Sequence, residues 1–234
     1  LWMAQCRRNQ ELLTQVPPSN PAGFTADASA VRTIVRSALS AGRELLGDLE
    51  AKQVLQAYGI PVVMTRVATS PDSAAGIAAE LGFPVALKIF SADLSHKSDV
   101  GGVVLNLHST AAVRQAAQDM LARVSALRPQ ARIEGFTVQP MVQRPGAHEL
   151  IVGAATDPTF GPVVLFGQGG TAVEVIGDRA IALPPLNMVL ARELVSRTRI
   201  SRLLAAHRDQ PAADVDAICR VLMQIAQLIA DMPE

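Results

Sequence analysis

The sequence predicts an α/β protein with two lobes, a split α/β sandwich followed by a second α+β lobe. The first lobe is indicated by the order strand, helix, strand, strand, helix, strand between residues 60 and 139. The second is indicated by glycine-separated strands over 149–176 that two amphipathic helices follow. We expect a tail, linker and leading helix in 1–42, the first lobe in 43–141 and the second in 142–234.

The composition supports an aliphatic core and excludes several classes of function. Apolar residues make up 49% of the chain and aromatic residues 3%, which excludes wholesale disorder and disfavours stacking platforms for nucleic-acid bases. The 21 basic residues balance the 21 acidic ones, so no net field attracts nucleic acid or anionic lipid. No apolar run spans a membrane and no secretory signal is present. Cys6 and Cys219 lie at opposite ends without metal-ligand spacing, which indicates free thiols in a cytoplasmic protein.

Elements up to residue 139 follow from periodicity and punctuation. The prediction is helices over 1–13, 27–42 and 45–58, a strand over 60–67, a helix over 70–81, strands over 84–90 and 102–107, a helix from Ser109 or Thr110, and a strand over 133–139. Ser70 followed by Pro71 is typical of a helix start, whereas Gly59 and Gly82 are typical of helix ends. Leu39 belongs to the apolar residues at helical spacing in the first long helix, and Leu45 is expected on the buried side of the second. Three prolines within 15–25 predict a linker.

Beyond residue 142 the pattern changes to strands and then helices. The prediction is strands over 149–155, 162–166 and 171–176, and helices over 187–206 and 211–232. The last helix is strongly amphipathic, with inward positions at Val215, Ile218, Leu222, Ile225 and Ile229.

A polar loop between two buried strands, residues 91–102, is the first candidate site. It follows Lys88, carries Ser95, Lys97 and Ser98, and closes with Gly101 and Gly102. A lysine charge, serine hydroxyls and backbone N–H groups that glycine leaves accessible are typical of phosphate binding. A solvated loop with a snorkelling Lys88 is the alternative. We favour phosphate binding because the polar loop begins three residues after the lysine.

His96 lies inside this loop, where Lys97 and Asp99 flank it. A solvated histidine is the ordinary interpretation of such a position. A mobile imidazole beside bound phosphate can also accept a phosphoryl group through a ring nitrogen.

Further candidates lie along the next strands. Backbone groups of 139–142 either pair with an adenine edge or form an ordinary connector between lobes. Glu149 either accepts from ribose hydroxyls or is an edge-strand charge. The turn 167–170 either lets backbone approach a ligand or is a tight hairpin. Glu174 and Asp178 either face phosphate or Mg²⁺ or pair with Arg179.

Taken together, these pieces resemble the ATP-grasp domain of the NDP-forming acyl-CoA synthetases, which include ADP-forming acetate–CoA ligases and succinyl-CoA synthetase beta subunits. The motifs that match in order and spacing are SHKSDVGGV at 95–103, VQPMV at 138–142, Glu149 with Gly153, Asp157-Pro158 with Phe160-Gly161-Pro162, and Gly167-x-Gly169-Gly170 with Glu174. The resemblance covers roughly 42–234 and implies a two-lobed ATP-grasp fold.

The resemblance also implies roles for the candidate residues. Lys88 contacts the phosphates of ATP or ADP, and the loop with Ser95, Lys97, Ser98, Gly101 and Gly102 covers them. The adenine hinge is formed by Gln139, Met141 and Val142, whereas Glu149 binds ribose and Gly169, Gly170 and Glu174 complete the nucleotide site. His96 is the catalytic residue, a second phosphohistidine. The implied reaction exchanges acyl-CoA, phosphate and ADP with acid, CoA and ATP. The implied partners are CoA-binding and phosphohistidine domains, in the same chain or in an alpha subunit, with a homo-oligomer possible.

Two features at the ends qualify this interpretation. Residues 1–25 are similar to the join in fused members, some of which carry a GNAT-type protein acetyltransferase domain. A nucleotide- or acyl-CoA-sensing module of such an acetyltransferase is therefore the alternative function. The family's D/E-x-N-P-L motif, whose asparagine helps to hold Mg²⁺, does not follow the last helix. We expect a C-terminally truncated chain, inactive alone, with its Mg²⁺ ligands beyond residue 234.

Overall fold

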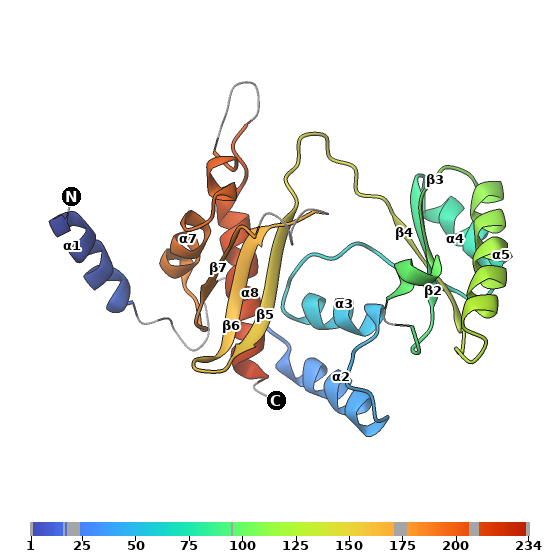
Figure 1. Cartoon of the computed structure of the whole chain (residues 1–234), viewed down its shortest axis with the longest axis horizontal. Helices are drawn as coiled ribbons and strands as arrows, with labels where there is room; N and C mark the ends of the chain where they lie inside the picture. Colours follow the sequence, from blue (N-terminus) through green and yellow to red (C-terminus); the bar gives the residue numbers. More distant parts are fainter. Residues whose placement is uncertain are drawn as a thin grey trace. The chain divides into compact units, whose positions relative to one another are not determined.

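The computed structural model divides the chain into two units, each with its own hydrophobic core (Figure 1). Unit 1 comprises Leu1–Leu46, Glu50–Pro61 and Pro145–Glu234, and unit 2 comprises Gly47–Leu49 and Val62–Arg144. The residues that the structure describes are 2–15, 17, 24–94, 96–170, 177–205 and 211–232.

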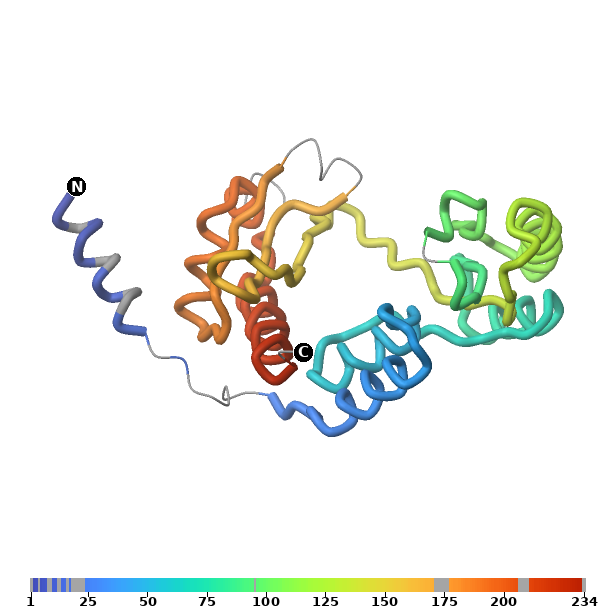
Figure 2. Tube along the Cα trace, turned by 60° about the horizontal axis from the view of Figure 1, so that its bottom comes forward, coloured from blue at the N-terminus to red at the C-terminus, as the bar shows by residue number. Residues whose placement is uncertain are grey.

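Unit 2 is built on a four-stranded antiparallel sheet. Its strands β1 (Arg66–Ala68), β2 (Val85–Phe90), β3 (Val103–Leu107) and β4 (Gly135–Pro140) pair in the order β1-β4-β2-β3. The helices α4 (Pro71–Leu81) and α5 (Thr110–Leu127) lie side by side on one face of this sheet (Figures 1 and 2). This chain order confirms the predicted split α/β sandwich.

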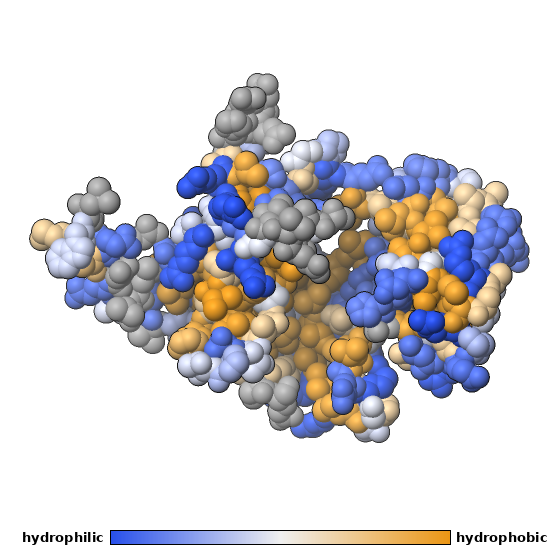
Figure 3. Space-filling model, in the orientation of Figure 1, coloured by the Kyte–Doolittle hydropathy of each residue, from blue (hydrophilic) through white to orange (hydrophobic). Residues whose placement is uncertain are grey.

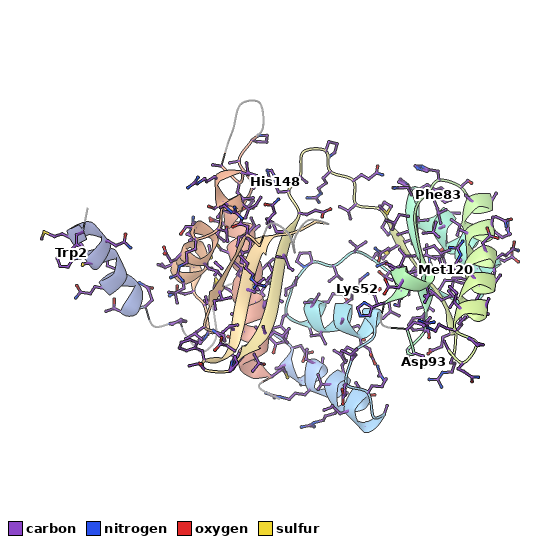
Figure 4. The ribbon with its side chains drawn as sticks, viewed as in Figure 1. Trp2, Lys52, Phe83, Asp93, Met120 and His148 are labelled. Carbon is purple, nitrogen blue, oxygen red and sulfur yellow. The ribbon has the colours of Figure 1, made fainter. Side chains whose placement is uncertain are left out.

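The face of the sheet toward these helices forms the core of unit 2. Val85, Leu87 and Ile89 alternate along β2 and are fully buried. Met120 on α5 is buried with them (Figure 4). Each such side chain contributes about 1.5–3 kcal/mol through burial, so aliphatic runs stabilise a unit that has few aromatic residues.

Both helices of unit 2 begin where the sequence predicts. The Ser70 hydroxyl accepts a hydrogen bond from the Ser73 N–H, and the Ser109 hydroxyl accepts one from Ala112, each at 3.1 Å. Gly82 ends α4 with a φ of 83°, a conformation that favours glycine. These caps fix the directions of the strands that follow.

Unit 1 contains a second antiparallel sheet, a meander of three strands. β5 (Leu150–Asp157), β6 (Gly161–Gln168) and β7 (Arg179–Ala182) pair in chain order. The helices α7 (Met188–Ser196) and α8 (Val215–Asp231) pack against it. The shared apolar cluster includes Val164, Phe166, Leu194 and Leu222.

Three further helices belong to the N-terminal part of the chain. α2 (Ala28–Ser40) and α3 (Asp48–Ala57) contribute to a cluster that includes α8, in which the Tyr58 hydroxyl donates to the Asp231 carboxylate at 2.8 Å. α1 (Trp2–Leu13) carries the exposed side chain of Trp2, labelled in Figure 4. Apolar side chains also reach the surface elsewhere in both units (Figure 3).

The first predicted helices differ from the observed ones. The helix expected over 45–58 begins at Asp48, and Leu45, expected inward, is 70% exposed. Leu39 is also exposed, whereas Val31 and Ala38 form the buried stripe of α2. The periodicity was therefore correct, but the predicted buried face was too wide.

The C-terminal helices are shorter than predicted. The helix expected over 187–206 ends at Ser196, because the Thr198 hydroxyl donates to the Val195 carbonyl at 2.7 Å and the 3₁₀ turn η2 (Ile200–Arg202) follows. The last helix begins at Val215, because the Asp214 carboxylate accepts from the Ala217 N–H. Side chains that bond to backbone groups set these ends.

Some predicted strands also differ from the observed ones. The strand expected over 60–67 is reduced to Arg66–Ala68, the residues that pair with Phe136–Val138, and the Thr65 hydroxyl donates to the Val63 carbonyl just before it. The strand expected over 171–176 lies outside the described residues. β7 had not been predicted. The lobe limits at 42/43 and 141/142 stay a prediction.

Cys6 is exposed and Cys219 is buried, and both are free thiols, as predicted. Among the described segments, no helix has both the length and the hydropathy needed to cross a bilayer.

Candidate functional site

Strand β2 carries Lys88 on the face of the sheet opposite the helices. Its neighbours Leu87 and Ile89 are fully buried in the helix-facing core, so side-chain alternation directs Lys88 to the other side. Lys88 is half-buried and pairs in register with Thr137 on β4 and Val103 on β3. No described residue accepts a hydrogen bond from the Lys88 ammonium group or forms an ion pair with it.

The polar loop is fastened to the core at both ends. Leu94 and Val100 are 8% and 5% exposed and belong to the core of unit 2. Between them, the 3₁₀ turn η1 (Lys97–Val100) starts after the exposed His96. The Asp93 carboxylate in the adjoining turn accepts from the Arg132 N–H at 2.8 Å (Figure 4). The loop therefore presents its imidazole to solvent from an ordered base.

Gly101 and Gly102 close this loop against β2. Gly101 has a φ of 66°, which side chains rarely adopt, and its N–H donates to the Ser98 carbonyl. The Gly102 N–H donates to the Lys97 carbonyl at 2.7 Å, and its carbonyl accepts from Ile89 at 2.8 Å. The end of the loop is thus hydrogen-bonded one residue beyond Lys88.

The predicted hinge continues from β4. Gln139 pairs with Ala86, which precedes Lys88 by two residues on β2. The cross-strand pair Gln139–Ala86 therefore lies about 7 Å along the strand from the pair Thr137–Lys88. The Met141 N–H donates to the Pro84 carbonyl at 2.9 Å, so this donor is engaged within the unit. The Val142 N–H has no acceptor among the described residues, and its side chain is 60% exposed. Of the two N–H groups, only that of Val142 remains available.

In unit 1, the turn after β6 contacts Glu149. The Gly169 N–H donates to the Glu149 carbonyl at 2.9 Å. A Cβ on Gly170, which has a φ of 89°, would lie 3.1 Å from the Glu149 Oε2 atom. Glu149 itself is exposed, next to His148 at the start of β5 (Figure 4). The structure therefore brings together Glu149, Gly169 and Gly170, which the sequence placed twenty residues apart.

Asp178, for which the sequence left open either phosphate or Mg²⁺ binding or pairing with Arg179, has a structural role. Its two carboxylate oxygens accept from the backbone N–H groups of Arg199 and Ile200, each at 2.7 Å, and the Arg199 Nε lies 3.7 Å away. Burial by itself raises the pKa of this carboxyl, but the two N–H donors and the Arg199 charge outweigh burial and hold the pKa below its usual value. The carboxylate is committed to the start of η2 and is not free to face phosphate or a metal ion.

Two predicted site residues, Ser95 and Glu174, lie outside the described part of the chain. Within that part, no group of three or more His, Cys, Asp or Glu side chains is arranged to hold a metal ion.

Thr137 is a polar neighbour of Lys88 that the sequence analysis did not single out. It faces Lys88 across the β2–β4 pair, is fully buried, and its hydroxyl has no hydrogen-bond partner. The signal was present, because Thr137 and Gln139 are the polar residues that alternate with Phe136 and Val138 along the strand. Such alternation indicates a second, polar sheet face.

Comparisons with known proteins agree with this architecture. The ATP-grasp domain family matches residues 37–234. The chain is 41% identical over 201 residues to acetate–CoA ligase (ADP-forming) I of Archaeoglobus fulgidus, and it is 35% identical over 201 residues to the beta subunit of acetate–CoA ligase (ADP-forming) II of Pyrococcus furiosus. Each alignment covers 86% of this chain, but 29% of the first relative and 84% of the second.

A solved structure shows the same fold. A dinucleotide-forming acetyl-coenzyme A synthetase 1 chain of Ca. Korarchaeum cryptofilum, in complex with coenzyme A, Ca-AMPCP and HgCl⁺, superposes with a TM-score of 0.79 at 37% identity. The match covers 86% of this chain and 87% of that one.

Proposed function

Because the chain belongs to the ATP-grasp domain family and is the ATP-grasp domain of an NDP-forming acetate–CoA ligase, we propose that it binds ADP and ATP for phosphoryl transfer through His96. The observation that carries the proposal is the arrangement on β2. Lys88, the closed end of the polar loop and the predicted hinge are all attached to this one strand.

The strand gives each group a distinct part. Lys88 has an uncompensated ammonium on the sheet face and contacts the nucleotide phosphates. The loop with Ser95, Lys97 and Ser98 covers the phosphates, and Gly101 and Gly102 keep it close to the strand. Gln139, Met141 and Val142 flank the adenine, with the Val142 N–H as donor to its edge. Glu149 accepts from the ribose hydroxyls, and Gly169, Gly170 and Glu174 complete the ribose end of the nucleotide site.

His96 relays the phosphoryl group. A ring nitrogen of His96 attacks the phosphorus of a phosphohistidine on a partner domain, so that one N–P bond forms while the partner's N–P bond breaks. A terminal oxygen of the ADP β-phosphate then attacks the same phosphorus. The new P–O bond completes ATP, and the His96–phosphorus bond breaks to restore neutral histidine. The exposure of His96 on an anchored loop fits both encounters.

The full reaction needs more than this chain. The Archaeoglobus relative is more than three times as long as the matched region, and the Pyrococcus relative is a beta subunit. We propose that CoA-binding and phosphohistidine domains, from an alpha subunit or the same parent protein, supply CoA, the acid and the first phosphohistidine. Mg²⁺ enters with the nucleotide, with its remaining protein ligands beyond the described residues.

The first experiment measures nucleotide binding. Isothermal titration of ADP and ATP, with Mg²⁺, is compared for wild type, Lys88→Ala and the control Arg114→Ala, whose side chain pairs with Asp72 on the helix-covered side. We expect Lys88→Ala to weaken binding by at least tenfold, since a charge-assisted contact is lost, and Arg114→Ala to bind normally. Equal affinities for all three would contradict the proposed site.

The second experiment tests the relay. The protein that carries this chain is incubated with [γ-³²P]ATP and Mg²⁺, and acid-labile label is measured. We expect label in wild type and in His108→Ala, an exposed histidine after β3, but none in His96→Ala. Label that persists in His96→Ala assigns the relay to another residue.

The alternative is a module that senses nucleotide or acyl-CoA for a fused GNAT-type acetyltransferase. The coverage of 29% of the Archaeoglobus relative is compatible with a domain inside a longer protein of either kind. Nucleotide binding without phosphoryl label, in a protein that acetylates lysine, favours this alternative. Formation of acetyl-CoA from acetate, ATP and CoA excludes it.

A further inference from the structure

The sheet face of unit 2 that is turned away from α4 and α5 carries a row of side chains through Lys88. Strand pairing places Val67 on β1, Thr137 on β4, Lys88 on β2 and Val103 on β3 side by side. Directly paired residues of an antiparallel sheet point to the same face, with Cβ atoms about 4.5–5.5 Å apart. Thr137 is therefore the one polar neighbour of Lys88 within its row.

The Thr137 hydroxyl is left without a partner at a position with no exposed surface. A buried hydroxyl that makes no hydrogen bond destabilises a folded chain, whereas valine has nearly the same shape and needs no partner. The nearby Gln139 does not satisfy it, because neither this side chain nor any other described group lies within hydrogen-bonding geometry of the Thr137 Oγ1 atom. The ligand-free protein thus retains an unfavourable group beside the predicted phosphate-binding lysine.

Lys88 is the complementary group. A lysine ammonium has three N–H donors, and no described residue accepts from this one. A nucleotide phosphate can engage two of the three donors from the open side of the sheet. The third then points back toward the sheet, where Thr137 offers a free acceptor.

We propose that Thr137 is a positioning residue for Lys88. It accepts the third ammonium N–H when phosphate draws Lys88 across the sheet face, and it holds the other two donors on the phosphate oxygens. This inference rests on the proposed nucleotide function. It adds that the unsatisfied hydroxyl of the free protein becomes satisfied in the complex, so that the free energy gained there contributes to nucleotide affinity.

The test is a double-mutant cycle measured by isothermal titration of ADP with Mg²⁺. Thr137→Val removes the acceptor with little change of shape, and Lys88→Met removes the donor. We expect Thr137→Val to weaken ADP binding about 10- to 150-fold, the value of one hydrogen bond to a charged group. In the Lys88→Met background, the same substitution should have no further effect, since the two residues act as one unit.

Three further measurements separate positioning from a structural role. Thr137→Ser keeps the hydroxyl and should restore wild-type affinity. Adenosine, which lacks phosphate, should bind wild type and Thr137→Val equally. Without nucleotide, Thr137→Val should melt at the same temperature as wild type or roughly 2–4 °C higher, because an unsatisfied group has been removed.

The outcomes distinguish this inference from the function on which it rests. Wild type that does not bind ADP overturns both. Wild type that binds ADP, with Thr137→Val unchanged or equally weakened in both backgrounds, overturns only the role of Thr137. If Thr137→Val does not fold, Thr137→Ala and Thr137→Ser replace it, since these two differ only in the hydroxyl, and equal ADP affinities for this pair overturn the inference.

Discussion

The two glycine-rich turns, Gly101-Gly102 in unit 2 and Gly169-Gly170 in unit 1, look alike in sequence and are held in different ways. The first closes a loop whose ends, Leu94 and Val100, are buried apolar side chains. The second is held by backbone hydrogen bonds, from Gly169 to the Glu149 carbonyl and from Gln168 to the Asp178 carbonyl at 3.0 Å. Backbone hydrogen bonds hold both turns, but buried apolar side chains flank only the first, and Asp178, whose carboxylate is hydrogen-bonded, lies beside only the second. The two turns should therefore respond differently to added volume and to pH.

The largest effect is expected at Gly102. A Cβ there would lie 2.6 Å from the Ile89 Cγ2 atom and 2.9 Å from the Lys97 carbonyl oxygen. Because Ile89 is core and the oxygen is backbone, neither can move cheaply, and Gly102→Ala should lower the free energy of unfolding by about 3 kcal/mol. Urea denaturation followed by circular dichroism measures this. A loss below about 1 kcal/mol would mean that the loop is not packed as tightly as the structure shows.

The order and type of most elements could be predicted from the sequence, because caps and periodicity are local signals. Ser70 with Pro71, Ser109 and Gly82 marked their helix ends correctly. The errors at element ends came from local side-chain bonds to the backbone, as at Thr198 and Asp214, whereas the contacts of Asp178 are non-local. The sequence left Asp178 either to face phosphate or Mg²⁺ or to pair with Arg179, but its partner is the backbone at Arg199 and Ile200, more than twenty residues away.

The same distinction between local signals and non-local contacts applies to the residues of the candidate site. The position of Lys88 on the sheet face opposite the helices follows from alternation along β2, and the link of Gly102 to Ile89 follows from the hairpin. The burial of Thr137 and the use of the Met141 N–H by Pro84 depend on strands that meet only in the folded sheet. No local pattern carries that information.

The second effect concerns Asp178, whose backbone carbonyl accepts from the second turn and whose carboxylate holds the start of η2. Asp178→Ala leaves the N–H groups of Arg199 and Ile200 without acceptors and should lower the free energy of unfolding by about 2 kcal/mol. The effect should depend on pH. Since the folded-state pKa lies below the usual 3.8, the contribution is complete above that value and is lost as the pH falls through the folded-state pKa.

Urea denaturation at pH 6 and at pH 3 checks the sign. The difference between wild type and Asp178→Ala should shrink at pH 3, whereas the loss caused by Gly102→Ala should be the same at both values. A difference that grows on acidification would contradict the assigned direction of the pKa shift.

A smaller effect is expected at Gly169. A Cβ there would lie 3.0–3.2 Å from backbone atoms of Glu149 and Leu150, which is tight but within reach of a small backbone shift. Gly169→Ala should therefore cost about 1 kcal/mol and displace the start of β5. Hydrogen exchange of the Gly169 amide, which donates to Glu149, should accelerate in the variant. Unchanged protection would show that the turn tolerates the methyl group in place.

The smallest effect is expected at Gly153, which separates the role of packing from that of glycine itself. Gly153 belongs to the sequence motif with Glu149, yet its backbone is extended within β5 and a Cβ would meet no atom within 4 Å. Gly153→Ala should leave the folded contacts intact and reduce the freedom of the unfolded chain, for a gain of about 0.5 kcal/mol. The same urea assay measures it.

Since glycine is replaced by alanine at Gly102, Gly169 and Gly153 alike, a graded series of about 3, 1 and −0.5 kcal/mol for the loss of unfolding free energy can only reflect what surrounds each Cβ. Equal losses at all three positions would contradict the assignment of the cost to the atoms that surround each Cβ.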